Sequence, residues 1–287
     1  MRSNMRGLRK NRKAVSPAIS TVIMTAAVIS MILVAMTFAN NILDSRLAEN
    51  EFATNKQFMF TTGLQVDDIA WTVGRTQTVR YSSRYGNIQF QNESLSYTLE
   101  VNATGVSGWQ VLTSSTTGMI MFTIPVTTYN LGNNYFERLS PSSNGSFLQQ
   151  GPSAPVAHVL CLEKLPMVDG SYARIVAVPT IRMLNSTITG FTQSSTNYFK
   201  FYLPILVNAS SNPYLSQSVT MMGTNILKVT KSGVYGVRIN VTFPKALSLG
   251  YDSSFFNFDH LSEVRTFDQA SVVEFYMGKV TVGIGQV

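Results

Sequence analysis

The hydrophobic pattern divides the chain into one continuous apolar run and a long section of alternating positions. Residues 14–43 contain no charged side chain, and apolar residues would cover all sides of a helix drawn through them. The stretch from Val15 to Leu43 gives about 44 Å of helix, whereas about 20 apolar residues span a bilayer. The pattern therefore predicts a membrane-spanning helix near the start of the chain.

Charged residues enter the pattern after Asn40, in "NNILDSRLAENEFATNKQFMF". Leu43, Leu47 and Phe58 fall roughly at helical spacing, so we expect the helix to continue through about Lys56 as an amphipathic stem. The apolar stripe of this stem should dock on the rest of the protein. Residues 15–60 are therefore predicted to form the membrane helix and its stem.

From Thr61 onward the chain is rich in β-branched and aromatic residues. In "GVRINVTF", Val237, Ile239 and Val241 alternate with polar residues, which is typical of a strand with one buried face. Many short strands predict a mainly antiparallel, β-sandwich-like head over residues 61–287, and the expected fold class is α+β. The other strand-like stretches are "DDIAWTVG", "NIQFQNESLSYTLEVNATG", "GMIMFTIPVTTY", "ARIVAVPTIRML", "YFKFYLPILVN" and "ASVVEFYMGKVTVGIGQV".

One part of the head, residues 129–155, differs in composition from its surroundings. It is poor in β-branched residues and rich in turn formers. Two interpretations fit this composition: a long surface insertion, which we favour slightly, or a seam between two β lobes.

The charge of the chain is concentrated at its beginning. Six of the 22 basic residues precede Ala14, and the remainder holds 16 basic and 15 acidic residues. Because the rest of the chain is nearly neutral, it offers no broad positively charged surface for nucleic acid, and no nucleic-acid partner is expected. Six cations before an apolar helix hold that end in the cytoplasm, which predicts a single-pass cytoplasmic-membrane protein with its head outside.

Residues suited to catalysis or metal binding are sparse. Cys161 is the only cysteine, and His158 and His260 are the only histidines, so no ligand cluster is evident. No phosphate-binding loop, dinucleotide fingerprint or nucleophile elbow occurs. We therefore expect neither enzymatic activity nor a cofactor or metal.

The junction between the basic leader and the apolar run carries the most specific signal. Ser16 is suited to cap the helix and Pro17 to occupy its first position. The surrounding "RKAVSPAISTVIM" resembles the processing site of archaeal type IV pilins. This resemblance covers about 45 residues, and Ile19 stands where bacterial pilins have a glutamate.

The resemblance implies a mechanism of assembly. A prepilin peptidase would recognise Arg12, Lys13, Ala14 and Val15 and remove the leader, residues 1–14, by cutting between Ala14 and Val15. A cut after Lys13 fits less well. The mature helix would then exchange lipid for copies of itself or other pilin subunits in an extracellular adhesive filament.

Two alternatives stay open. The chain can be an unprocessed, signal-anchored surface protein whose head binds a ligand. Within the pilin interpretation, a head of this size also suits a minor or tip subunit. The state of the Ala14–Val15 junction separates the two classes.

Six Asn-x-Ser/Thr sequons lie in the head, where an exported chain meets the glycosylation machinery. We expect Asn144, in a turn, to be a better acceptor than Asn240, in mid-strand. The full set is Asn92, Asn102, Asn144, Asn185, Asn208 and Asn240.

A second surface feature is the interleaving of arginine and tyrosine in "VGRTQTVRYSSRYG". Such a stretch can form a stacking platform for a glycan or another surface ligand. A solvated hairpin is the favoured interpretation, because "SSRYG" interrupts the strand.

Overall fold

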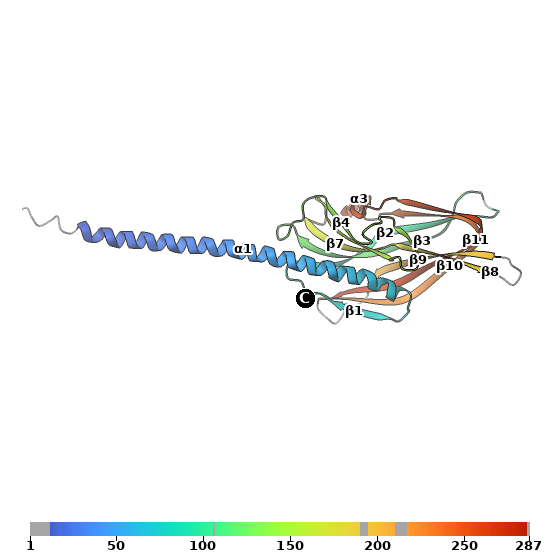
Figure 1. Cartoon of the computed structure of the whole chain (residues 1–287), viewed down its shortest axis with the longest axis horizontal. Coiled ribbons are helices and arrows are strands. Elements are labelled where there is room, and N and C mark those ends of the chain that lie inside the picture. The colour runs from blue at the N-terminus through green and yellow to red at the C-terminus, as the bar shows by residue number, and fades with distance from the viewer. Residues whose placement is uncertain (1–11, 106, 190–194, 210–216, 286–287) are drawn as a thin grey trace, which may run out of the picture. The chain divides into compact units, whose positions relative to one another are not determined.

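The computed structural model describes residues 12–105, 107–189, 195–209 and 217–285, and Figure 1 shows the chain with most of its elements labelled. Over these residues one long helix precedes an 11-stranded, mostly antiparallel sheet, so the chain is α+β as predicted. The elements are α1 (Arg12–Ala70), β1 (Thr76–Arg80), β2 (Asn87–Ala103), β3 (Gln110–Pro125), β4 (Tyr135–Ser140), β5 (Leu148–Gln150), β6 (Ala157–Glu163), β7 (Tyr172–Pro179), β8 (Ile181–Thr189), β9 (Ser195–Asn208), β10 (Ser218–Thr242), α2 (Ala246–Leu249), α3 (Ser253–Phe256) and β11 (Ser262–Gly285).

The chain divides into two compact units, Met1–Ala48 and Glu49–Val287. Within the described residues, the first unit is the N-terminal part of α1, here called the apolar segment where it runs from Ile19 to Leu43. The second unit, here called the head, contains the rest of α1 together with every strand.

The helix ends later than its sequence predicted. It continues to Ala70, so "DDIAWTVG" forms the last turn of α1 and the turn that follows, and its prediction as a strand is wrong. The reason is a stripe of buried residues that recurs every three or four positions, which only a helix brings onto one face. This stripe consists of Phe52, Asn55, Met59, Thr62, Val66 and Ile69.

The stripe expected from the sequence is confirmed only in part. Phe58 is buried in the head, but Leu43 and Leu47 are about half exposed and belong to the first unit. The docked face therefore begins at Phe52 and extends to the end of α1.

The strands form one sheet in the order β4-β6-β7-β3-β2-β10-β11-β9-β8-β5, with β1 paired to β10. Only β9–β11 and β5–β8 are parallel pairs. Residues 129–155 contribute β4 and β5, which lie at the two ends of this order. They are therefore neither a seam between two lobes nor an insertion outside the sheet.

The sheet curls so that strands distant in its order approach one another. Thr117 on β3 accepts a hydrogen bond from the backbone N–H of Leu206 on β9 (2.9 Å). Between these strands lies the main core, which contains Met119, Phe201 and Phe275. The expected sandwich of two separate sheets is thus realised as two facing halves of one continuous sheet.

The head part of α1 covers the outer side of β3, β6 and β7. Phe52 packs against Phe122 on β3 with ring centroids 6.2 Å apart. A methyl of Val159 on β6 would lie 2.7 Å from a Cβ placed on Gly63, so the helix and strand are in close contact there. Strands β6 and β7 are buried on both faces, which explains why they read as continuous apolar runs.

Two glycines allow the end of α1 to pack closely against the long strands β10 and β11. A Cβ at Gly223 would lie 2.5 Å from the carbonyl oxygen of Ile69, and one at Gly278 still closer to the carbonyl oxygen of Ala70. Side chains at these positions would push the helix away from the sheet. The part of α1 that belongs to the head is therefore packed against both halves of the sheet.

Candidate functional site

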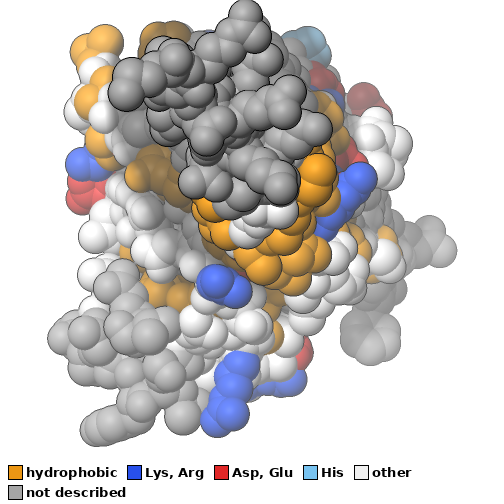
Figure 2. All heavy atoms as spheres, turned by 90° about the vertical axis from the view of Figure 1, so that its left-hand side faces the viewer, with side chains coloured by type: hydrophobic (Ala, Val, Ile, Leu, Met, Phe, Trp, Pro, Cys, Tyr) orange, Lys and Arg blue, Asp and Glu red, His pale blue; other side chains and the backbone are white. Residues whose placement is uncertain are grey.

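The apolar segment exposes large hydrophobic side chains on every side. Fourteen residues between Ile19 and Leu43 are about half exposed or more, with Val34 at 68% and Phe38 at 67%. In Figure 2 hydrophobic side chains gather on the helix, seen end-on. Burial of one such side chain contributes about 1.5–3 kcal/mol, so leaving all of them in water costs on the order of 20 kcal/mol. The segment therefore requires an apolar environment.

Three hydroxyls of the apolar segment donate hydrogen bonds within the helix. Thr25 donates to the carbonyl of Thr21 (2.8 Å), Ser30 to that of Ala26 (2.8 Å) and Thr37 to that of Leu33 (2.9 Å). An unsatisfied hydroxyl would be costly in hydrocarbon. Because each of these three donors already has an acceptor, these hydroxyls leave no uncompensated donor when the segment enters lipid or a helix bundle.

Among the described helices, α1 alone is long and apolar enough to cross a membrane. This property agrees with the sequence prediction of a signal or anchor near the N-terminus. It places the chain with membrane or secreted proteins.

The predicted processing site lies at the very start of α1. Arg12, Lys13, Ala14 and Val15 are helical in their backbone, and their side chains lie outside the described part of the structure. The remainder of the predicted leader, residues 1–11, is also outside it.

The predicted cap residues lie within α1. Ser16 and Pro17 are helical, and among the described residues α1 extends back to Arg12. A proline within a helix lacks the N–H that would bond the carbonyl four residues earlier, here that of Lys13, and its ring crowds that carbonyl.

In the head, one carboxylate joins α1 to the loop that follows β1. Glu51 accepts hydrogen bonds from the Ser83 hydroxyl (2.6 Å) and from the backbone N–H groups of Arg84 (2.8 Å), Tyr85 (3.1 Å) and Gly86 (2.9 Å). Converging N–H groups of this kind make an anion-binding concavity. Here the anion is the side chain of Glu51, which fixes the helix to the loop.

This loop is the stretch for which the sequence offered a stacking platform, and the platform does not form. Tyr81 is buried with its ring 5.7 Å from that of Phe58, and Arg75 pairs with Asp68. The guanidinium of Arg84 lies over the ring of Tyr85. Sequence reasoning missed the role of Glu51, because a single acidic residue in a helix carries no signal for a partner 32 residues away.

A second ionic contact ties α1 to the edge strand β4. The Lys56 ammonium lies 2.6 Å from the carboxylate of Glu137, which also accepts from the Tyr135 hydroxyl (2.8 Å). Burial alone would lower the pKa of Lys56, but the hydrogen bond and charge of Glu137 raise it. The same hydrogen bond lowers the pKa of Glu137. Both groups are therefore charged at neutral pH.

The single cysteine and one histidine are packed in the head. Burial lowers the pKa of His158 to about 3, assisted by the positive charge of Arg138, and burial raises the pKa of Cys161 to about 12. His158 is thus neutral and Cys161 a thiol at neutral pH. Among the described residues there is no group of three or more potential metal-ligating side chains.

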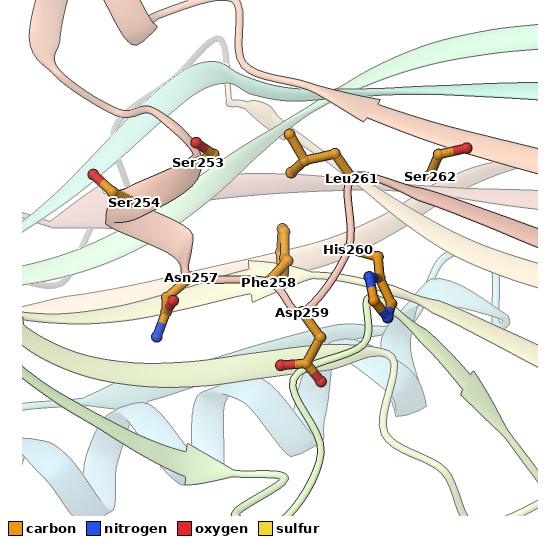
Figure 3. A pocket seen from close by; sticks show the side chains of 8 residues that line it. All are labelled: Ser253, Ser254, Asn257, Phe258, Asp259, His260, Leu261 and Ser262. Atoms are coloured by element: carbon orange, nitrogen blue, oxygen red, sulfur yellow. The ribbon is translucent and has the colours of Figure 1, made fainter.

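An open hollow lies beside α3 and contains the other histidine (Figure 3). Asp259 and His260 project to one side of its loop and Leu261 to the other. Asp259 accepts from the backbone N–H of Gly145 (3.0 Å) and pairs with Arg138 (3.4 Å), so its carboxylate supports the loop. The hollow is lined by Ser253, Ser254, Asn257, Phe258, Asp259, His260, Leu261 and Ser262.

The six sequon asparagines all lie at least partly exposed on the head. Asn92, Asn144, Asn185 and Asn208 are exposed, while Asn102 and Asn240 are partly buried. Asn144 is in the loop between β4 and β5 and Asn240 is within β10, as predicted. The side-chain amide of Asn144 donates to Gln149 (3.2 Å).

Comparisons with known proteins identify no relative: no family model, no curated protein and no solved structure matches the chain. The architecture itself is pilin-like, since a long apolar N-terminal helix precedes a large mixed β-sheet. What the arrangement can do is limited by its chemistry. It offers an apolar helical surface for lipid or for other helices, joined in sequence to a β-rich head.

Proposed function

We propose that this chain is a type IV pilin-like subunit that is processed by a prepilin peptidase and assembled through α1 into or onto a surface filament. The observation that carries the proposal is the apolar segment, whose exposed side chains need lipid or protein neighbours and in which the hydroxyls of Thr25, Ser30 and Thr37 are already satisfied. The resemblance of "RKAVSPAISTVIM" to archaeal pilin processing sites is the reason for proposing the pilin family.

The head supports the proposal through its construction. The last part of α1 is a component of the core of the head, held by Phe52, by Glu51 and by the close approaches at Gly223 and Gly278. The apolar segment and the part of α1 in the core of the head belong to one helix, Arg12–Ala70. This property suits a subunit of a filament whose heads face the external medium and make adhesive contacts.

Mass spectrometry of the chain purified from its native membrane or filaments tests the processing. We expect the mature chain to begin at Val15. The variant Ala14→Glu should retain its leader and yield no surface filaments, whereas Asn11→Ala, a change in the leader away from the junction, should be processed normally.

Other N-termini lead to other conclusions. A chain that begins at Met1 in the native surface fraction contradicts processing and favours the signal-anchored binding protein. A chain that begins after the apolar segment contradicts both interpretations and indicates ordinary secretion.

A further inference from the structure

We propose that Asn102 carries an N-linked glycan whose first pyranose packs against the indole of Trp109. The inference rests on the proposed function, since only an exported head meets the glycan donor. It selects one sequon of six and names the protein surface that receives the sugar.

Asn102 lies on the outer face of the sheet, in a hairpin with Trp109. Val101 and Ala103 are buried in the core, so the side chain between them points to the opposite face. Val101 pairs with Gln110 across β2 and β3, which brings Asn102 opposite Trp109 as the next pair. On its other side, Asn102 pairs with Gly236 of β10.

The indole crosses β2 beside Asn102. The Cη2 atom of Trp109 would lie 3.3 Å from a Cβ built on Gly236, although Trp109 precedes β3 and Gly236 belongs to the strand on the far side of β2. Paired residues on adjacent strands have Cα atoms about 4.5–5.5 Å apart. The ring of Trp109 therefore lies within reach of the first sugar attached to Asn102.

The surroundings of the indole match the chemistry of a pyranose. A sugar presents C–H groups on its faces, which suit the electron-rich face of an aromatic ring, and hydroxyls around its rim. The guanidinium of Arg238 lies over one face of the Trp109 ring, 5.0 Å from its centroid, so the sugar would use the other face; Arg238 is also paired with the carboxylate of Glu100. This ion pair offers both donors and acceptors to the hydroxyls. Arg238 retains 34% side-chain exposure, so the pair is open to a ligand.

The other sequons that lie in paired strands lack an open aromatic neighbour. Asn240 pairs with Thr98 and Ser262, and Asn208 pairs with Val282. Asn185 faces Phe199, whose ring is stacked on Phe267 at 3.8 Å and is occupied on that side.

The modification is a group transfer from a lipid-phosphate-linked glycan. The side-chain nitrogen of Asn102 forms a bond to the anomeric carbon, the bond from that carbon to the phosphate oxygen breaks, and the lipid phosphate leaves with the electron pair. The nitrogen loses one proton. In the folded head the exposed hydroxyl of Thr104, the third sequon residue, donates to the carbonyl of Gly233 on β10 (3.0 Å).

Site-resolved glycopeptide mass spectrometry and a double-mutant cycle on the full chain from its native host test the proposal. We expect Asn102 to be occupied, and Trp109→Ala to lower the melting temperature more in the wild-type background than in an Asn102→Gln background. A difference of about 2–4 °C is the size expected for one modest contact in a domain of this size. The matched control is Asn240→Gln, in which Trp109→Ala should act as in the wild type.

An unmodified Asn102, or a Trp109→Ala effect that is equal with and without the glycan, overturns the proposal. If Trp109→Ala does not fold, Trp109→Leu keeps an apolar side chain without the ring and gives the same test. The outcome is independent of filament assembly: an occupied Asn102 on a chain that begins at Met1 would contradict the pilin proposal but not this one.

Discussion

The two parts of α1 use the same backbone structure in different surroundings. The apolar segment is hydrophobic all round and exposed, whereas the part in the head buries one face and exposes residues such as Leu64 on the other. In the first part every direction must meet lipid or another helix. In the second part the sheet supplies the apolar partner and water covers the rest. The comparison teaches that hydrophobicity on all sides, rather than helix length, marks the surface that requires an apolar environment.

The largest effect is expected from a charge in the middle of the apolar segment. Val34→Arg should abolish stable membrane insertion and filament assembly, because arginine at the centre of a spanning helix costs about 2.5–3.5 kcal/mol. Membrane fractionation and electron microscopy of the cell surface measure both effects. Leu64→Arg, at an exposed position of the same helix in the head, is the control and should assemble normally. Normal filaments from Val34→Arg would refute the conclusion that the apolar segment requires apolar surroundings on every side.

The largest loss of folding stability, as distinct from membrane insertion, is expected when a large side chain is removed from the docked face of α1. Phe52→Ala should destabilise the head by about 3–5 kcal/mol, because it leaves a cavity against Phe122 and Tyr129. Thermal unfolding of the detergent-solubilised chain, followed by near-ultraviolet circular dichroism, should show the loss. Leu64→Ala should change the transition little, and equal effects of the two substitutions would mean that this face is not packed as described.

Lowering the pH should destabilise the head but leave the helical structure of the apolar segment unchanged. The unfolded chain protonates His158 near pH 6.5, whereas the folded head keeps it neutral until its pKa of about 3. The unfolded state therefore binds more protons in this window, and stability falls as the pH drops from about 6.5 toward 3. Between pH 6.5 and 4 the loss is about 3 kcal/mol.

His158→Gln should flatten this part of the stability profile, as measured by denaturant unfolding at a series of pH values. The apolar segment contains no titratable residue, so its helical circular dichroism in detergent should persist through the same range. The control His260→Gln, at an exposed position of the hollow, should keep the wild-type slope. An unchanged slope in His158→Gln would assign the acid sensitivity to other groups.

The smallest effect concerns the contact between Glu51 and its loop. Glu51→Gln keeps the size of the side chain but removes the charge that strengthens four hydrogen bonds, so we expect a loss of about 1.5–3 kcal/mol. Urea unfolding measures the change. Glu93→Gln, at an exposed position of the head, should shift stability by less than about 0.5 kcal/mol. A neutral Glu51→Gln would show that the loop holds its place without the carboxylate.

Several features of the fold could be predicted from local patterns. The uncharged run from Val15 to Leu43 allowed only a helix with apolar surroundings, and the alternation of Val237, Ile239 and Val241 specified a strand with its buried face. Both are properties of periodicity, which needs no knowledge of distant residues. Likewise, the turn position of Asn144 followed from its turn-forming neighbours.

Other features of the fold could not be predicted from local sequence patterns. "DDIAWTVG" has the composition of a strand, but the burial of Val66 and Ile69 on the sheet continues the helix through it. The edge strands β4 and β5 contain few β-branched residues and are held by pairing with β6 and β8. Tertiary burial and pairing outweigh local propensity in both cases.

The sequence by itself determined that this protein has a basic start, an apolar helix and a β-rich remainder, because charge and periodicity are properties of neighbouring residues. Only the tertiary structure decided where α1 ends, that the strands form one curled sheet, that Glu51 occupies the loop after β1, and that Trp109 lies across β2 beside Asn102. The physical reason is that each of these contacts joins residues that are distant in sequence or lie on different strands. Such contacts form only when the whole head folds, and no local pattern records them.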